Sequence, residues 1–208
     1  MVFLFPHWLP EQFSPLFDIP SIFRKAPARS NCRHFDFGKI RGRHHSFHLH
    51  HQDGEKIWKL YHTMNTRFLT FCKELLIYLD KFYKFRAENE WNRVREKIPR
   101  TLGLFGTIFT TIVCNMDSCS WHIDPCDLGF AVLIYAGSWQ GGCLELGLPE
   151  TPFRISLKSL DIIFLKSSQV FHFVSQYTGT RKSFGIYSHL IKGSPNVIEK
   201  KGLPFLEQ

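Results

Sequence analysis

The sequence predicts an α+β fold in which a double-stranded β-helix, or jelly roll, is braced by helices that precede it. Two amphipathic stretches lie in the first half of the chain, and seven or eight short apolar runs follow Gly103 with turn residues between them. At 208 residues the chain fits a single domain. We divide it into an N-terminal arm with a basic, histidine-rich loop (1–52), a helical brace (53–98) and the double-stranded β-helix core (99–208).

The N-terminal region is rich in proline, aromatic and basic residues. Five prolines over 1–30 favour an extended arm laid over the core. The stretch 33–51, RHFDFGKIRGRHHSFHLHH, places four basic residues among six histidines. Such a loop suits contact with a phosphate backbone, and a polar connecting loop is the alternative. The net charge of +8 and the pI of about 9.3 fit a polyanionic partner, although a solvated basic surface also explains them.

The predicted brace consists of two helices. Apolar residues recur every three or four positions over 53–82, which predicts a long helix with its start near Asp53. A second helix is predicted from Glu88 to Lys97, because Pro99 ends it. We interpret both apolar stripes as packing surface against the β-core. No apolar run is long enough to cross a membrane, and six cysteines without a CxxC pair indicate free thiols.

The predicted β-core is a series of short runs rich in Phe, Ile, Val and Thr. The predicted strands cover 104–114, 130–135, 143–146, 153–157, 162–165, 170–174 and 184–190. Gly137 and the segment 178–180 are among the predicted turns. This spacing, without helices between the strands, is typical of a jelly roll.

One constellation within the β-core points to chemistry. His122 and Asp124 lie two residues apart, so on a strand they face the same way, and His172 follows far downstream. Two histidines and one carboxylate form the facial triad that binds non-haem Fe(II) and leaves positions open. Arg181 would clamp a dicarboxylate co-substrate, and Ser183, on the same face, would add a hydroxyl. The alternatives are a chance HxD pair, a core histidine and a solvated arginine.

The motifs around these residues extend the pattern. They are Asn115, Trp121-His122-Ile-Asp124-Pro-Cys-Asp127, Trp139-Gln-Gly141-Gly142-Cys-Leu144, Leu160-Asp161-Ile-Ile-Phe164, His172 and Gly179-Thr-Arg181-Lys-Ser183. Together they resemble the TET/JBP-type Fe(II)/2-oxoglutarate dioxygenases, most closely the fungal, transposon-associated branch. The resemblance covers about residues 104–191. It departs from the family pattern at Leu160-Asp161, where members carry a Gly-Asp turn.

The resemblance implies a set of cofactor contacts. Carried over position by position, His122, Asp124 and His172 are the expected ligands of Fe(II). Arg181 is the expected partner of 2-oxoglutarate, with Ser183 beside it, and O₂ is the second co-substrate. These expectations agree with the ligand chemistry that the residue types alone suggest.

The resemblance also implies a substrate. Members of the family flip a modified pyrimidine or thymine out of DNA and oxidise its methyl group. Asp127 stands where members place an amide or carboxylate that reads the flipped base, and a carboxylate can accept from the amine of cytosine. His189 stands where some relatives place a second base-contacting histidine. The alternatives are a turn carboxylate after Pro125 and an ordinary strand histidine.

The sequence therefore predicts a nuclear, monomeric dioxygenase that oxidises 5-methylcytosine in DNA. One alternative keeps the fold and the iron chemistry but acts on a protein or peptide, as prolyl hydroxylases do. Another is a transposon-derived DNA-binding protein whose iron site has decayed. The residue pattern leaves open 5-methylcytosine, N6-methyladenine or thymine as the base, and DNA or RNA as the polymer.

Overall fold

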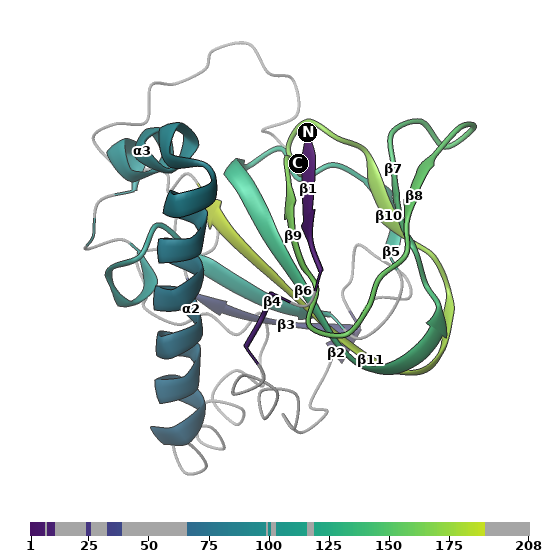
Figure 1. The fold of residues 1–208 in the computed structure, drawn as a ribbon, viewed down its shortest axis with the longest axis horizontal. Coiled ribbons are helices and arrows are strands. Elements are labelled where there is room, and N and C mark those ends of the chain that lie inside the picture. The colour runs from purple at the N-terminus through teal and green to yellow at the C-terminus, as the bar shows by residue number, and fades with distance from the viewer. Residues whose placement is uncertain are drawn as a thin grey trace.

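The structure, a computed structural model, describes residues 1–6, 8–10, 24–25, 33–38, 66–98, 100, 103–115 and 119–189. Within these residues two α-helices cover one face of a large antiparallel sheet, and a small antiparallel sheet lies on the other side (Figure 1). The predicted α+β class, with a jelly-roll core braced by helices, is confirmed.

Eleven strands form the two sheets of the described chain. The larger sheet has the order β1 (Val2–Phe5), β9 (Ile162–Leu165), β6 (Asp127–Gly141), β11 (Tyr177–His189), β4 (Thr111–Asn115), β3 (Arg33–Gly38) and β2 (Arg24–Lys25). The smaller sheet has the order β5 (Cys119–His122), β10 (His172–Val174), β7 (Leu144–Leu146) and β8 (Phe153–Ile155). All neighbouring strands run antiparallel.

The two α-helices are α2 (Thr66–Arg86) and α3 (Glu88–Lys97). The bounds predicted for the second helix are confirmed by α3. The predicted long helix matches α2 over its described part, while its predicted start at Asp53 lies outside the described residues. Leu75, Leu79 and Tyr83 recur at a spacing of four and are fully buried, so the apolar stripe is packing surface, as predicted.

Two apolar layers meet at the large sheet. On β9 the side chains of Ile162 and Phe164 belong to the cluster that includes the helices, whereas Ile163 and Leu165 belong to the cluster between the sheets. Successive side chains on a strand point to opposite faces, so both faces of β9 are buried. The space between the sheets is the interior of the jelly roll, and the candidate site lies there.

The long antiparallel pair of β6 and β11 differs from the prediction. Gly137 and the segment 178–180 lie within strands, because β6 runs to Gly141 and β11 begins at Tyr177. Gly137 and Gly179 have φ of 119° and 105°, which permits the pair of strands to bend where a turn was predicted. Both strands curl toward the small sheet (Figure 1). A glycine signal in the sequence thus marks a bend here and not a chain reversal.

Two further segments differ from the prediction. The first part of the predicted 104–114 strand is a 3-10 turn, η2 (Leu104–Gly106), and the strand begins only at Thr111. The beginning of the predicted basic loop is instead β3, which pairs with β4 and with β2. The rest of that loop, 39–51, lies outside the described residues.

The structure tests the membrane and thiol predictions over the described residues only. In these parts of the chain no helix is long and apolar enough to cross a membrane. Cys72, Cys126 and Cys143 are free thiols, as predicted. Burial raises the pKa of the Cys72 thiol well above its usual range, so this cysteine behaves as an apolar core residue.

The helices meet the start of β6 at a glycine, which yields a stability prediction. A Cβ added at Gly129 would lie 2.5 Å from Val94 Cγ2 and 2.6 Å from Tyr83 Oη, at a φ of +68°. We expect Gly129→Ala to lower the free energy of unfolding by about 2–4 kcal/mol, from backbone strain and overpacking together. Gly106→Ala is the control, because Gly106 has a φ of +77° with nothing near its Cβ position. Urea denaturation measures both, and equal losses would contradict the packing effect.

Candidate metal centre

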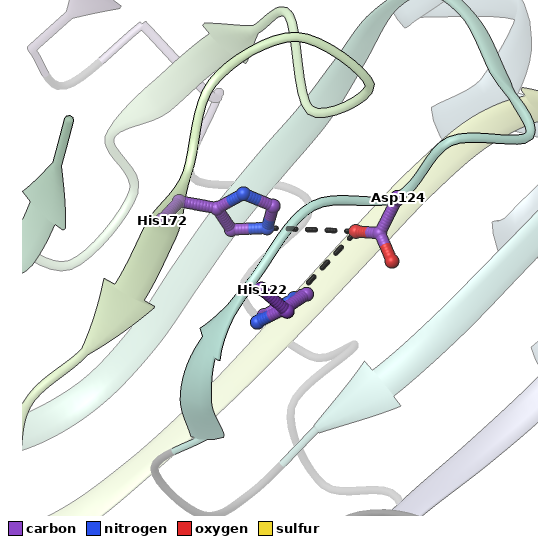
Figure 2. A group of neighbouring side chains, drawn as sticks. All are labelled: His122, Asp124 and His172. Carbon is purple, nitrogen blue, oxygen red and sulfur yellow. Dashed lines mark ion pairs between the residues drawn. The ribbon is translucent and has the colours of Figure 1, made fainter. Parts of the chain in front are cut away.

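The predicted triad comes together where two strands of the small sheet pair. His122 ends β5 and His172 begins β10, and the two residues are directly opposed in the antiparallel register. Their ring centroids are 4.1 Å apart. Asp124 follows on the loop after β5, and the ligand atoms of all three residues lie within 4.8 Å of one another (Figure 2).

Backbone contacts fix the orientation of both imidazoles. Nδ1 of His122 lies 2.7 Å from the carbonyl oxygen of Ser120, and Nδ1 of His172 lies 3.0 Å from that of Val170. A carbonyl can only accept, so each Nδ1 carries a proton, and in the neutral ring Nε2 is the nitrogen available as a ligand. The two Nε2 atoms lie 3.6 and 3.5 Å from the same oxygen of Asp124, Oδ2. Two imidazole nitrogens and a carboxylate oxygen thus converge on one point (Figure 2).

This donor set fits a divalent transition metal. Neutral imidazole and carboxylate suit first-row metals, and a histidine ligand normally donates its other N–H to a second group, as both do here. The backbone of Asp124 is also fixed, because its N–H donates to the carbonyl of Ser167 at 2.9 Å. Its own carbonyl accepts from the N–H of Asp127 at 3.0 Å, which closes the turn between the two residues.

The triad stands in the wall of a cavity between the sheets. Together with the solvent at its mouth, the cavity encloses about 580 Å³ of empty space. Besides the triad it is lined by apolar residues of the inner faces and by a few polar groups. The principal polar groups are Ser167, Arg181, Ser183 and Tyr187. A mostly apolar cavity with a few convergent polar groups is the usual form of a small-molecule site.

Arg181 lies in this cavity as a buried cation. It is 2% exposed, and its Nη1 donates to the carbonyl of Gly142 at 3.1 Å. Its guanidinium lies over the ring of Tyr177 at 3.8 Å, an attractive cation–π geometry. A Cβ at Gly142 would lie 2.3 Å from Nη1, so only glycine leaves room for the guanidinium. Ser183 lines the same cavity, as expected from its position two residues further along β11.

Asp127 and His189 are brought together, but not into the cavity wall. They are paired in the β6–β11 register, and His189 Nε2 lies 2.6 Å from Asp127 Oδ1. The other oxygen of Asp127 accepts from the hydroxyl of Ser167 at 2.5 Å. The ring of His189 stacks on Tyr187, with centroids 5.4 Å apart and an interplanar angle of 15°. Ser167 and Tyr187 do line the cavity, so the pair lies directly behind its wall.

Burial dominates the electrostatics of Asp127. It raises the pKa of that carboxyl above its usual range, and the hydrogen bond and charge of His189 oppose this effect. The nearby carboxylate of Asp124 raises the pKa further. A carboxylate so deeply buried requires polar partners: Ser167 donates a hydrogen bond to Oδ2, and His189 Nε2 lies within ion-pair distance of Oδ1.

Several residues of the site could not be predicted from the sequence. Ser167 contacts both Asp124 and Asp127, yet it stands in a short segment that predicts only a turn. The carbonyls of Ser120 and Val170 orient the histidines through the backbone, so their side-chain identities say nothing about this role. The role of the Ser167 hydroxyl could be predicted only by knowing that its loop contacts Asp127.

Comparison with known proteins places the fold. No family model and no curated protein matches the chain. Among solved structures, "NgTET1 in complex with 5mC DNA" is similar at a TM-score of 0.62 and 15% identity, over 90% of this chain and 72% of that one. A Pseudomonas putida prolyl-4-hydroxylase follows at 0.52 and 14%, over 90% and 91%. An oxidoreductase of the 2OG-Fe(II) oxygenase family from Burkholderia pseudomallei has 0.50 and 14%, over 89% and 82%.

The chain shares the fold of these oxygenases. At 14–15% identity the likeness concerns the fold alone. One of these structures is that of a TET protein, the family that the sequence motifs resemble. None of these matches bears on the fungal, transposon-associated branch, which stays a prediction.

The geometry of the triad predicts metal-dependent stabilisation. We expect Ni²⁺ at about 100 times its dissociation constant to stabilise the purified protein by about 2.7 kcal/mol, because the ion binds only the folded chain. His172→Ala should abolish this effect. Val174→Ala is the control, since it alters the same strand without removing a ligand. Thermal unfolding with and without Ni²⁺ measures the difference, and undiminished stabilisation of His172→Ala would exclude this metal site.

Proposed function

We propose that the protein is an Fe(II)- and 2-oxoglutarate-dependent dioxygenase that oxidises the methyl group of 5-methylcytosine in DNA. One observation carries the enzymatic part. Two imidazole Nε2 atoms and one carboxylate oxygen converge in the wall of a cavity that also contains the buried cation of Arg181. A closed structural metal site would need no cavity and no buried arginine beside it.

We assign His122, Asp124 and His172 as the iron ligands. Fe(II) bound there supplies the redox chemistry that couples 2-oxoglutarate and O₂ to oxidation of a C–H bond, with release of CO₂ and succinate. The contribution of the chain is to present two neutral nitrogens and one anionic oxygen from one side, so that the cavity side stays open for co-substrates. The backbone carbonyls that accept from each Nδ1–H keep both rings in the ligating orientation.

Arg181 and Ser183 are assigned to 2-oxoglutarate. The guanidinium is always charged, and its planar fork of N–H groups matches a carboxylate at two points. Its contacts with the carbonyl of Gly142 and the ring of Tyr177 hold this cation in the cavity lining, where a carboxylate of the co-substrate could pair with it. Ser183 lines the same space and places a hydroxyl group there.

The substrate assignment rests on Asp127 and His189, which contact the cavity-lining residues Ser167 and Tyr187. The similar structure of NgTET1 contains 5mC DNA, and the net charge of +8 suits a polyanion. We assign Asp127 and His189 to the flipped base, with the carboxylate accepting from the cytosine amine. Because both oxygens of Asp127 already have partners, the base must displace Ser167 or His189 to be read. A DNA substrate also accounts for the predicted nuclear location.

A protein or peptide substrate is the second candidate. It is favoured by one observation, the similarity to the Pseudomonas putida prolyl-4-hydroxylase, 91% of which the alignment covers. Nothing in the triad or in Arg181 separates the two, because both reactions use the same cofactor chemistry. The two candidates differ in the role of Asp127 and His189, which would contact a base only if the substrate is a nucleic acid.

A substrate panel tests the proposed reaction. Purified protein with Fe(II), ascorbate and 2-oxoglutarate should add oxygen to 5-methylcytosine in an oligonucleotide, with succinate formed alongside. Matched oligonucleotides with unmethylated cytosine, N6-methyladenine or thymine, and a proline-containing peptide, complete the panel, and mass spectrometry identifies the product. Oxidation of the peptide alone would favour the second candidate. DNA binding without turnover of any substrate would favour a decayed site.

The role of Arg181 predicts a selective kinetic defect. Arg181→Lys keeps the charge but loses the fork that binds a carboxylate at two points, so we expect KM for 2-oxoglutarate to rise about 10- to 100-fold, for a loss of about 1.5–3 kcal/mol. The affinity for DNA should not change. Arg154→Lys is the control, because Arg154 pairs with Glu145 on the small sheet and lies outside the cavity lining. An unchanged KM in Arg181→Lys would refute the assignment.

A further inference from the structure

One short loop contacts two of the three proposed metal ligands. The 166–170 loop, followed by Phe171, joins β9 to β10. The carbonyl of Ser167 accepts from the N–H of Asp124 at 2.9 Å, and the carbonyl of Val170 accepts from Nδ1 of His172 at 3.0 Å. The position of the Asp124 backbone and the ring orientation of His172 therefore both depend on where this loop lies.

Lys166 organises the loop through its backbone. Its carbonyl accepts from the N–H groups of Gln169 at 2.9 Å and Val170 at 3.0 Å, which folds the loop back on its first residue. Its own N–H donates to the carbonyl of Met1 at 3.2 Å. A displacement of Lys166 would thus be passed directly to Val170, and through it to His172.

The side chain of Lys166 connects this loop to the brace. Its ammonium pairs with the carboxylate of Glu90 on α3 and lies 4.6 Å from the ring centroid of Phe130. Only 15% of the Lys166 side chain and 19% of the Glu90 side chain are exposed, so solvent screens this pair less than a surface ion pair. Glu90 also lies 3.6 Å from Arg93, which is 77% exposed and has a weaker hold on the carboxylate.

The helix that carries Glu90 is itself fixed against the other side of the site. Val94 of α3 packs at Gly129, and Tyr83 of α2 accepts from the N–H of Phe130 at 2.8 Å. Both contacts are made by residues that closely follow Asp127 in the sequence, and Asp127 accepts a hydrogen bond from the hydroxyl of Ser167. The brace therefore contacts both the start of β6 and the 166–170 loop, and Glu90 is its charged contact with that loop.

We propose that Glu90 is a positioning residue for the metal centre, acting through Lys166 and the 166–170 loop on Asp124 and His172. This inference rests on the proposed metal site and adds a role for the helical brace, which then sets ligand geometry in addition to covering the sheet. Removing the charge of Glu90 should loosen the loop and lower the affinity of the triad for a metal ion.

Calorimetric titration of the metal-free protein with Ni²⁺ alone tests this. Glu90→Gln keeps the side-chain shape, and we expect its dissociation constant for Ni²⁺ to rise about 3- to 10-fold, at or below the range for groups bonded directly to a ligand. Glu88→Gln removes the same charge from the same turn of α3 at an exposed position and should leave the affinity unchanged. Lys166→Met should match Glu90→Gln, and the double variant should be no worse than either, because one interaction is removed.

The outcomes separate this inference from the function on which it rests. If wild-type protein binds no Ni²⁺, the proposed metal site fails and the inference with it. If the wild type binds and Glu90→Gln binds as Glu88→Gln does, the metal site stands and the positioning role is wrong. A loss of unfolding free energy in Glu90→Gln without a change in Ni²⁺ affinity would likewise reduce the pair to a stabilising contact. Should Glu90→Gln not fold, Lys166→Met gives the same comparison.

Discussion

The antiparallel register between β5 and β10 is the constraint on which the site depends. It places His122 opposite His172, so that two imidazoles from distant parts of the chain face one carboxylate. A slip of one residue would turn one of these side chains to the outer face of the small sheet. β7 pairs with β10 on its other side and sets Leu146 opposite His172, which leaves the short strand with partners along both edges. The geometry of the triad is therefore a property of the sheet and not of the loop alone.

The fold was largely predictable because its signals are local. The end of α3 follows from Pro99 and the bounds of β9 from an uninterrupted apolar run. Side chains that alternate between two buried faces explain why that run is apolar throughout. Bends within strands were not predictable, since Gly137 and Gly179 carry the same signal as a turn. The strand at Arg33–Gly38 was also missed, because its pairing with β4 is a long-range fact and its basic, histidine-containing sequence is typical of a loop.

The candidate site was predictable in its residue types but not in its contacts. His122, Asp124 and His172 could be grouped because ligand chemistry restricts the choice. The sequence could not indicate that Asp127 and His189 would pair with each other, since that contact follows from the β6–β11 register. Because burying a carboxylate is costly, Asp127 depends on this pairing: without the histidine, one of its oxygens would lose its nearest polar partner.

The turn before β9 shows how the chain accommodates Leu160 at a position where a Gly-Asp turn was expected. Leu160 has a φ of 69°, a conformation that costs a residue with a Cβ about 1–2 kcal/mol. Its N–H donates to Tyr135 at 2.8 Å, and its side chain packs against the core, which together offset this strain. The carboxylate of Asp161 accepts from the N–H of Lys158 at 2.9 Å and closes the turn. The four residues of β9, paired on both sides, lie between this turn and the 166–170 loop, so a stretch of paired strand separates the strained Leu160 from the residues that orient the triad.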